Sequence, residues 1–85
     1  MKVTVEVVGR YAVVVGRKVV TIELNDGSRL KDLLKKLEEV YGLKLELGTE
    51  SAIFINGIPM EFKGGLNAEL REFDRVLIVP AAFGG

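Results

Sequence analysis

The chain begins with a strict alternation of polar and apolar residues. Residues 2–7 place a valine at every second position, and residues 20–24 repeat the pattern with valine, isoleucine and leucine. A period of two predicts strands with one buried face, and we expect these two to pair as a hairpin. The intervening stretch 11–15 contains three consecutive valines, and this β-branched composition predicts an extended segment.

The pattern changes to a helical period over residues 30–41. Apolar residues recur there at intervals of three and four, which puts them along one stripe of an α-helix. Ser28 stands where an N-cap belongs, so its hydroxyl is expected to accept from the free amides of the first turn. Gly42 fits the left-handed position that ends a helix. The predicted stripe comprises Leu30, Leu33, Leu34, Leu37, Val40 and Tyr41.

Short apolar runs in the second half of the chain predict further strands. Residues 52–55 read as one strand, and the Asn56-Gly57 dipeptide that follows is typical of a two-residue hairpin turn. Residues 58–62 would return as a brief edge strand. Pro59 keeps that strand short, because proline has no amide hydrogen to donate to a neighbouring strand.

The last strand, residues 76–79, is apolar at every position and ends at Pro80. The predicted order is two strands, one long helix and two or three later strands, which cannot build a series of β-α-β units. The helix must instead cross one face of a mixed sheet of four to five strands. This is the β-grasp, or ubiquitin-like, roll of the α+β class. By analogy with that topology, the last strand lies beside the first at the centre.

Composition permits one hydrophobic core but removes most side-chain chemistry. Of the 85 residues, 48% are hydrophobic, and the chain has neither cysteine nor histidine. Disulfides and thiol nucleophiles are therefore excluded, and a serine hydrolase triad would lack its usual base. The acidic residues are scattered, so we expect no metal site. The sequence favours a carrier or binding protein over an enzyme.

The charges are balanced and interleaved along the chain. Twelve basic and twelve acidic side chains give a formal net charge of zero, and no basic block predicts nucleic-acid binding. No apolar run approaches the ~20 residues that a membrane span needs. The strand pattern starts at once after Met1 and leaves no room for a signal peptide, so the expected location is the cytoplasm.

The end of the chain is the remaining candidate for chemistry. The apolar run 76–83 is followed by Gly84-Gly85. A frayed terminus accounts for such an end by itself, but two glycines after the last strand of a β-grasp pattern point to a carboxylate that partner enzymes activate. Residues without a Cβ can thread a narrow enzyme channel. We therefore expect a domain over residues 1–80 and a flexible tail over residues 81–85, with Pro80 extending the departing chain.

Two of the later strands are apolar on both faces, whereas one helix can cover only one face of the sheet. Phe54, Leu77 and Val79 are therefore expected to be exposed near the tail and to form an apolar docking patch for a partner. The alternative is that both strands are central and that loops or a second copy of the chain cover their other face.

Taken together, these residues resemble the MoaD/ThiS family of ubiquitin-like sulfur carriers, which is related to archaeal small modifier proteins. The similarity spans nearly the whole chain and is most specific at Asn56-Gly57, at Asp74 and at Gly84-Gly85. The resemblance implies that a ubiquitin-activating-type adenylyltransferase activates the carboxylate of Gly85 with ATP and magnesium. A sulfur donor then converts it to a thiocarboxylate. The resemblance implies no permanently bound cofactor.

The resemblance leaves the sulfur acceptor open. In the molybdopterin (or tungstopterin) branch the tail enters the large synthase subunit and donates sulfur to the pterin dithiolene. In the thiamine branch the sulfur goes to the thiazole, and the length of this chain favours the first branch. The alternatives are a protein modifier joined through Gly85 to substrate lysines, and a binding module with an idle tail.

Two departures from the family pattern bear on the choice of partner. Phe83 stands where a small residue often precedes the terminal glycines, and Phe73 stands where a glycine precedes the aspartate. A bulky ring beside the glycines would either anchor the tail in a dedicated partner or exclude it from a standard synthase channel. Phe83 is therefore the residue expected to decide which enzyme accepts the tail.

Overall fold

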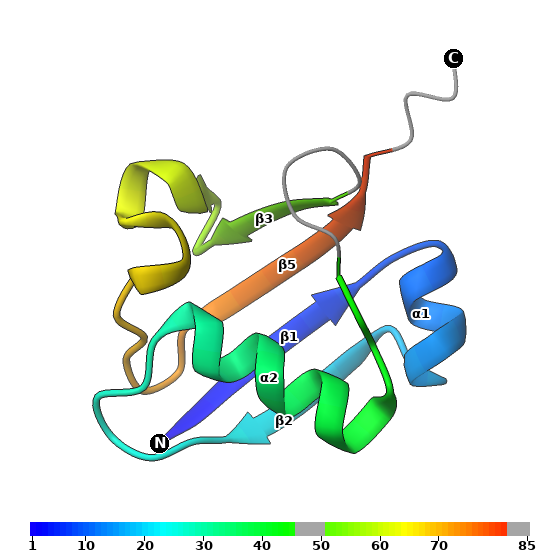
Figure 1. Ribbon diagram of the computed structural model, residues 1–85, viewed down its shortest axis with the longest axis horizontal. Coiled ribbons are helices and arrows are strands. Elements are labelled where there is room, and N and C mark those ends of the chain that lie inside the picture. Colours follow the sequence, from blue (N-terminus) through cyan, green and yellow to red (C-terminus); the bar gives the residue numbers. More distant parts are fainter. Residues whose placement is uncertain (46–50, 82–85) are drawn as a thin grey trace.

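The computed structural model describes residues 1–45 and 51–81 of the chain (Figure 1). Its strands form one mixed sheet in the order β2-β1-β5-β3-β4. They are β1 (Lys2–Val7), β2 (Val19–Glu23), β3 (Ser51–Ile55), β4 (Ile58–Pro59) and β5 (Arg75–Pro80). The α-helices are α1 (Arg10–Val15) and α2 (Leu30–Tyr41), and single 3-10 turns span Met60–Lys63 and Gly65–Asn67.

The first and the last strand lie side by side at the centre of the sheet. β1 and β5 run parallel, whereas β2 pairs with β1, and β3 with β5, in antiparallel fashion. α2 crosses one face of this sheet (Figure 1). The predicted β-grasp arrangement is therefore confirmed, including the hairpin of β1 with β2 and the central position of the last strand.

The core lies between α2 and the sheet. Leu30, Leu33 and Leu37 of α2 have no exposed surface, and the valines of β1 are at most 1% exposed. Leu34 is only partly buried at the margin of this core. Val40 is 55% exposed, so its predicted place in the buried stripe was wrong. It belongs to the last turn of α2, which extends past the edge strand β2 in the view of Figure 1.

The start of α2 differs from the prediction, and its end agrees with it. Ser28 does not cap the helix, because its carbonyl accepts from the amide of Leu70 at 3.0 Å and its backbone is thereby held in an extended pairing. Arg29 is the N-cap residue instead, and its amide donates to Oδ2 of Asp32 at 2.8 Å. Gly42 ends the helix in the left-handed conformation with φ of 71°.

The segment 11–15 is a short helix, so the predicted extended conformation was wrong. Tyr11 and Val15 lie four residues apart and reach the core from one side of α1, where they are 5% and 8% exposed. Gly9 and Gly16 adopt positive φ angles of 58° and 85° at its two ends. Burial of that one side and these two glycine boundaries outweigh the β-propensity of the valines.

The second hairpin is shorter than its sequence predicted. Asn56 and Gly57 adopt positive φ angles of 51° and 81°, as a two-residue hairpin turn requires. β4 then ends at Pro59, and the chain enters a 3-10 turn at Met60 rather than continuing as a strand to Phe62. Over the described ranges, no helix combines the length and the apolar character needed to cross a membrane.

Candidate functional site

The chain leaves the sheet at the end of β5. Because β1 and β5 are parallel, both strands finish at the same end of the sheet, so the end of β5 lies near the start of α1, which follows β1 (Figure 1). Pro80 is the last paired residue, and its partner on β3 is Ser51. Ala81 is the last described residue at this end. Phe83 and Gly84-Gly85 lie outside the described residues, so their role in the tail stays a prediction, as does the division into a domain and a flexible tail.

Two contacts tie α1 to the base of the tail. A Cβ added to Gly9 would lie 3.2 Å from Cγ of Pro80, so only glycine allows this close approach at its positive φ. The hydroxyl of Tyr11 shares a hydrogen bond with the hydroxyl of Ser51, directly across the ladder from Pro80. The beginning of α1, the beginning of β3 and the end of β5 are thereby held together.

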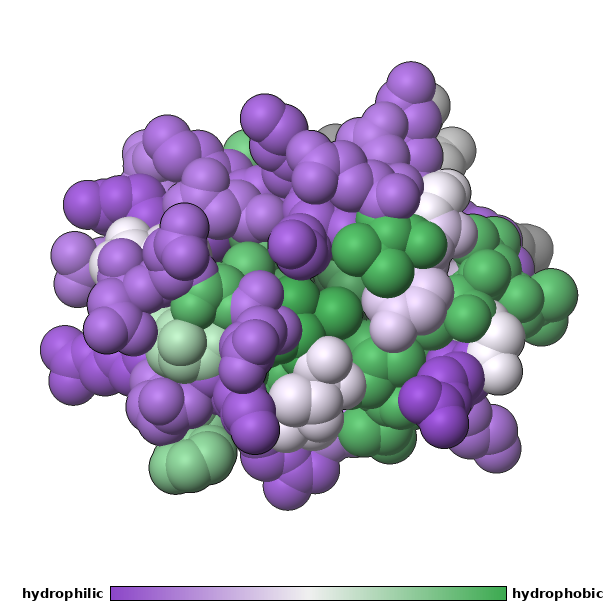
Figure 2. Space-filling view, turned by 90° about the horizontal axis from the view of Figure 1, so that it is seen from below, coloured by the Kyte–Doolittle hydropathy of each residue, from purple (hydrophilic) through white to green (hydrophobic). Residues whose placement is uncertain are grey.

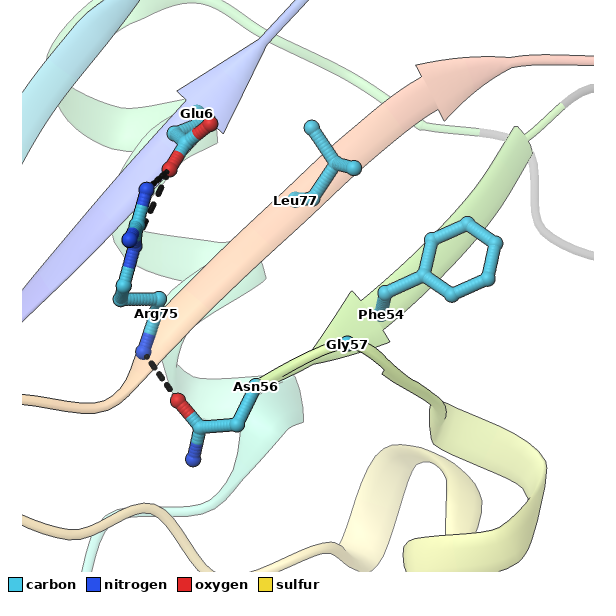
Figure 3. Close-up of a pocket in the computed structure, with 6 residues that line it drawn as sticks. All are labelled: Glu6, Phe54, Asn56, Gly57, Arg75 and Leu77. Atoms are coloured by element: carbon cyan, nitrogen blue, oxygen red, sulfur yellow. Dashed lines mark hydrogen bonds and ion pairs between the residues drawn. The ribbon is translucent and has the colours of Figure 1, made fainter.

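The predicted docking residues lie on the sheet face that α2 leaves open. Phe54 and Leu77 are register partners on β3 and β5, and both point away from α2 on the same side of the sheet (Figure 3). Each is half-buried, and so is Val79, two residues further along the same face of β5. The structure thus brings the three together and leaves them less exposed than the sequence predicted.

A hollow of ≈ 600 Å³ lies on this open face. Its lining combines apolar and charged groups (Figure 3): Glu6, Phe54, Asn56, Gly57, Arg75 and Leu77. The Arg75 guanidinium binds the Glu6 carboxylate through both Nε and Nη2, with Nε 3.1 Å from Oε1. Exposed ion pairs contribute little to stability, so this pair chiefly gives the hollow a charged side opposite Phe54.

The sequence prediction did not include Glu6 and Arg75. The alternation of β1 does indicate that Glu6 is on the polar face of its strand. Arg75 comes directly before the apolar run of the last strand, which offers a weaker signal. Their proximity depends on the parallel register of β1 with β5, in which Glu6 is opposite Leu77, and short-range pattern does not give that register.

Two motif residues that are distant in sequence are bonded to each other. Nδ2 of Asn56 donates to Oδ1 of Asp74 at 2.8 Å, and Oδ1 of Asn56 accepts from the amide of Arg75 at 2.9 Å. The second carboxylate oxygen of Asp74 accepts from the amide of Arg71 at 2.8 Å. Asn56 and Asp74 therefore brace the hairpin turn against the start of β5. This is a structural role at the end of the sheet opposite the tail.

Phe73 occupies a backbone conformation that favours glycine. Its φ is 66° and its side chain is 77% exposed. Its amide donates to the carbonyl of Lys2 at 2.8 Å, which fixes the turn before β5 against the start of β1. A left-handed φ costs a residue with a Cβ about 1–2 kcal/mol. The geometry thus gives a physical reason for the glycine that the family pattern places before the aspartate.

Within residues 1–45 and 51–81, no group of three or more acidic side chains is arranged to hold a metal ion. The same ranges contain no buried polar or charged side chain. The features that this part of the chain offers to a partner are the open sheet face, the exposed surface around α1 and the base of the tail.

Comparison with known proteins gives one family and several similar structures. A model described as the ThiS family matches residues 5–85. A search of curated protein sequences gives no match. A Pyrococcus furiosus protein described as molybdopterin converting factor, subunit 1, is 26% identical, with 94% of this chain and 97% of that chain covered and a TM-score of 0.81.

Two further structures are similar over almost their whole length. A chain of the BexX/CysO complex of Amycolatopsis orientalis is 25% identical, with 98% of this chain and 99% of that chain covered and a TM-score of 0.76. The small archaeal modifier protein 1 of Methanosarcina acetivorans is 22% identical, with 99% and 96% covered and a TM-score of 0.82. The second likeness, at this identity, is one of fold.

Proposed function

This chain belongs to the ThiS family, and we propose that it is a sulfur carrier whose terminal carboxylate, on Gly85, is adenylated and then converted to a thiocarboxylate. Family members are small carrier or modifier proteins rather than enzymes. The observation that carries the proposal is the extent of the family match, which runs to Gly85 instead of stopping where β5 ends at Pro80.

The chemistry explains why partner enzymes are required. A carboxylate resists attack by sulfur because it is negatively charged and has no good leaving group. One of its oxygens attacks the α-phosphorus of ATP, and the bond to pyrophosphate breaks while enzyme-bound magnesium neutralises the leaving charge. Hydrosulfide then forms a bond to the carbonyl carbon, and the bond to AMP breaks. ATP and magnesium thus belong to the adenylyltransferase, and the carrier itself needs no resident cofactor.

The residues of this chain would contribute presentation and recognition. Pro80 ends the ladder of β5, and Gly84-Gly85 lack the side chains that would block a narrow channel. The half-buried Phe54 and Leu77 offer apolar surface that a partner can cover, and the ion pair beside them orients that partner. In this proposal the open sheet face binds the partner while the tail enters its active site.

The favoured acceptor is the dithiolene of a molybdopterin or tungstopterin. The similarity to the Pyrococcus furiosus protein described as a molybdopterin converting factor subunit supports this branch. The corresponding partner would be a large synthase subunit that receives the tail. The chain of the BexX/CysO complex is a similar protein found with a partner, which supports partner binding in general.

Intact mass spectrometry tests the carrier function. The purified chain is incubated with a ubiquitin-activating-type adenylyltransferase, magnesium, ATP and sulfide. We expect a mass gain equal to the exchange of one oxygen for sulfur. A chain without Gly85 should show no gain and should melt at the same temperature as the full chain. An unchanged mass for the full chain would overturn the proposal.

Two further measurements separate the possible fates of the activated tail. The thiocarboxylated chain should support dithiolene formation when it is mixed with a large synthase subunit and a sulfur-free pterin precursor. If it supports thiazole formation instead, the pterin branch is wrong. Remnants of Gly84-Gly85 in isopeptide linkage to lysines of other proteins in cells would favour the modifier role.

A further inference from the structure

The surface around α1 carries exposed apolar side chains that do not pack into the core. We define the α1 surface by four valines with large exposed fractions, namely Val8 at 41%, Val13 at 81%, Val14 at 51% and Val19 at 52%. Apolar side chains gather at the end of the molecule that α1 occupies, beside strongly hydrophilic groups (Figure 2).

These valines are unfavourable for the free chain. Valine is a weaker helix former than alanine, lysine or glutamate, and α1 has only six residues. Its contacts with the core come from Tyr11, Ala12 and Val15, so packing against the core does not explain Val13 and Val14. A cluster of exposed apolar side chains that contributes neither to the core nor to solubility is typical of a surface that another protein covers.

The stretch of chain that carries these valines has charges of one sign, and Glu6, which lies across the β1–β2 ladder from Val19, is already paired with Arg75. Residues 8–19 include Arg10, Arg17 and Lys18 and no acidic residue, whereas the whole chain has twelve of each sign. Arg17 and Lys18 line a hollow of ≈ 320 Å³ together with Val13 and its neighbours. The complementary partner surface is therefore an apolar patch rimmed by aspartate and glutamate side chains.

The position of α1 relative to the tail indicates which partner this is. Gly9 packs on Pro80 and Tyr11 bonds to Ser51, so α1 is fixed against the base of the tail. We infer that the α1 surface docks the adenylyltransferase that activates Gly85, through an acidic-rimmed apolar patch next to its active-site entrance. The inference rests on the proposed function, in which adenylation is the step common to the carrier and the modifier roles.

Binding of the purified adenylyltransferase without ATP, measured by calorimetry, tests this inference directly. Val13→Ser should raise Kd about tenfold, the effect of losing one well-packed apolar contact. Val40→Ser is the matched control, because Val40 is also an exposed helical valine, at 55%, but lies on α2. It should leave Kd unchanged, and both variants should melt like the wild-type chain.

Charge reversal supplies an independent arm. Arg17→Glu should weaken binding and lower its dependence on salt, whereas Lys36→Glu on the exposed side of α2 should do neither. Equal Kd values for Val13→Ser and the wild-type chain would overturn the inference. It would be overturned equally if that variant instead lost self-association in sedimentation, or binding to phosphatidylglycerol vesicles, with an unchanged Kd for the enzyme.

The link between α1 and the tail base has its own readout. Tyr11→Phe removes only the hydroxyl that bonds to Ser51. The loosened tail base should lower kcat/KM for adenylation several-fold while Kd stays near the wild-type value, and Tyr41→Phe, at the other tyrosine of the chain, should change neither. A normal Kd with no adenylation of the wild-type chain would refute the proposed function. Absence of wild-type binding would refute the docking inference.

Discussion

The two faces of β5 are both apolar, yet they have different surroundings. Val76 and Ile78 face α2 and have no exposed surface, whereas Leu77 and Val79 face away from it and are only half-buried. Residues of the same chemical type therefore alternate between the core and an open surface. Hydrophobicity at a position therefore indicates burial only when a second layer is present to cover it.

The largest expected effect is on the covered face. Ile78→Ala removes a fully buried side chain from the centre of the sheet and leaves a cavity, so it should lower the free energy of unfolding by about 2–5 kcal/mol. Urea denaturation followed by circular dichroism measures this loss. At a temperature where the variant remains folded, its Kd for the adenylyltransferase should match that of the wild-type chain.

A smaller loss of stability is expected on the open face, with a larger effect on binding. Leu77→Ala should lower the free energy of unfolding by about 1 kcal/mol, because its side chain is only partly buried. It should raise the Kd for the adenylyltransferase about tenfold, since in the proposed function this enzyme covers the open sheet face on which Leu77 lies. If Leu77→Ala and Ile78→Ala cost equal stability and neither changed Kd, the distinction between the two faces would be wrong.

The smallest effect concerns the turn that leads into β5, which belongs to neither face. Phe73→Gly relieves a positive φ of 66° at the expense of a more flexible unfolded chain. The free energy of unfolding should rise by about 0.5–1 kcal/mol. Phe73→Ala keeps the Cβ and is the control that should show no gain. A loss of stability in Phe73→Gly would mean that the exposed ring contributes packing.

The elements with strong local periodicity could be predicted from sequence. The alternation in β1 and the leucine spacing in α2 each extend far enough to decide the type of element. The conformation of 11–15 could not be predicted in this way, since it depends on Gly9 and Gly16 and on the burial of one side. Ser28 failed as a cap for a similar reason, because a distant amide from Leu70 holds its backbone.

The candidate site could be predicted only where it depends on how many faces of the sheet the single long helix can cover. One helix cannot cover strands that are apolar on both sides, and this limit alone indicates that Phe54, Leu77 and Val79 lie on an open face. The pairing of Glu6 with Arg75 and the bond from Asn56 to Asp74 join residues whose proximity requires the register of the whole sheet. No local signal carries such a register.

The parallel pairing of β1 with β5 makes the first and last segments of the chain meet at the centre of the sheet, with Thr4 opposite Arg75. During synthesis β1 has no parallel neighbour until β5 has left the ribosome, so the core closes late. Val13 and Pro80 therefore reach their fixed positions relative to each other only when β5 has joined the sheet. An enzyme that recognises both residues would therefore bind folded chains in preference to nascent or truncated ones. Activation of the chain end would then require that the domain has folded.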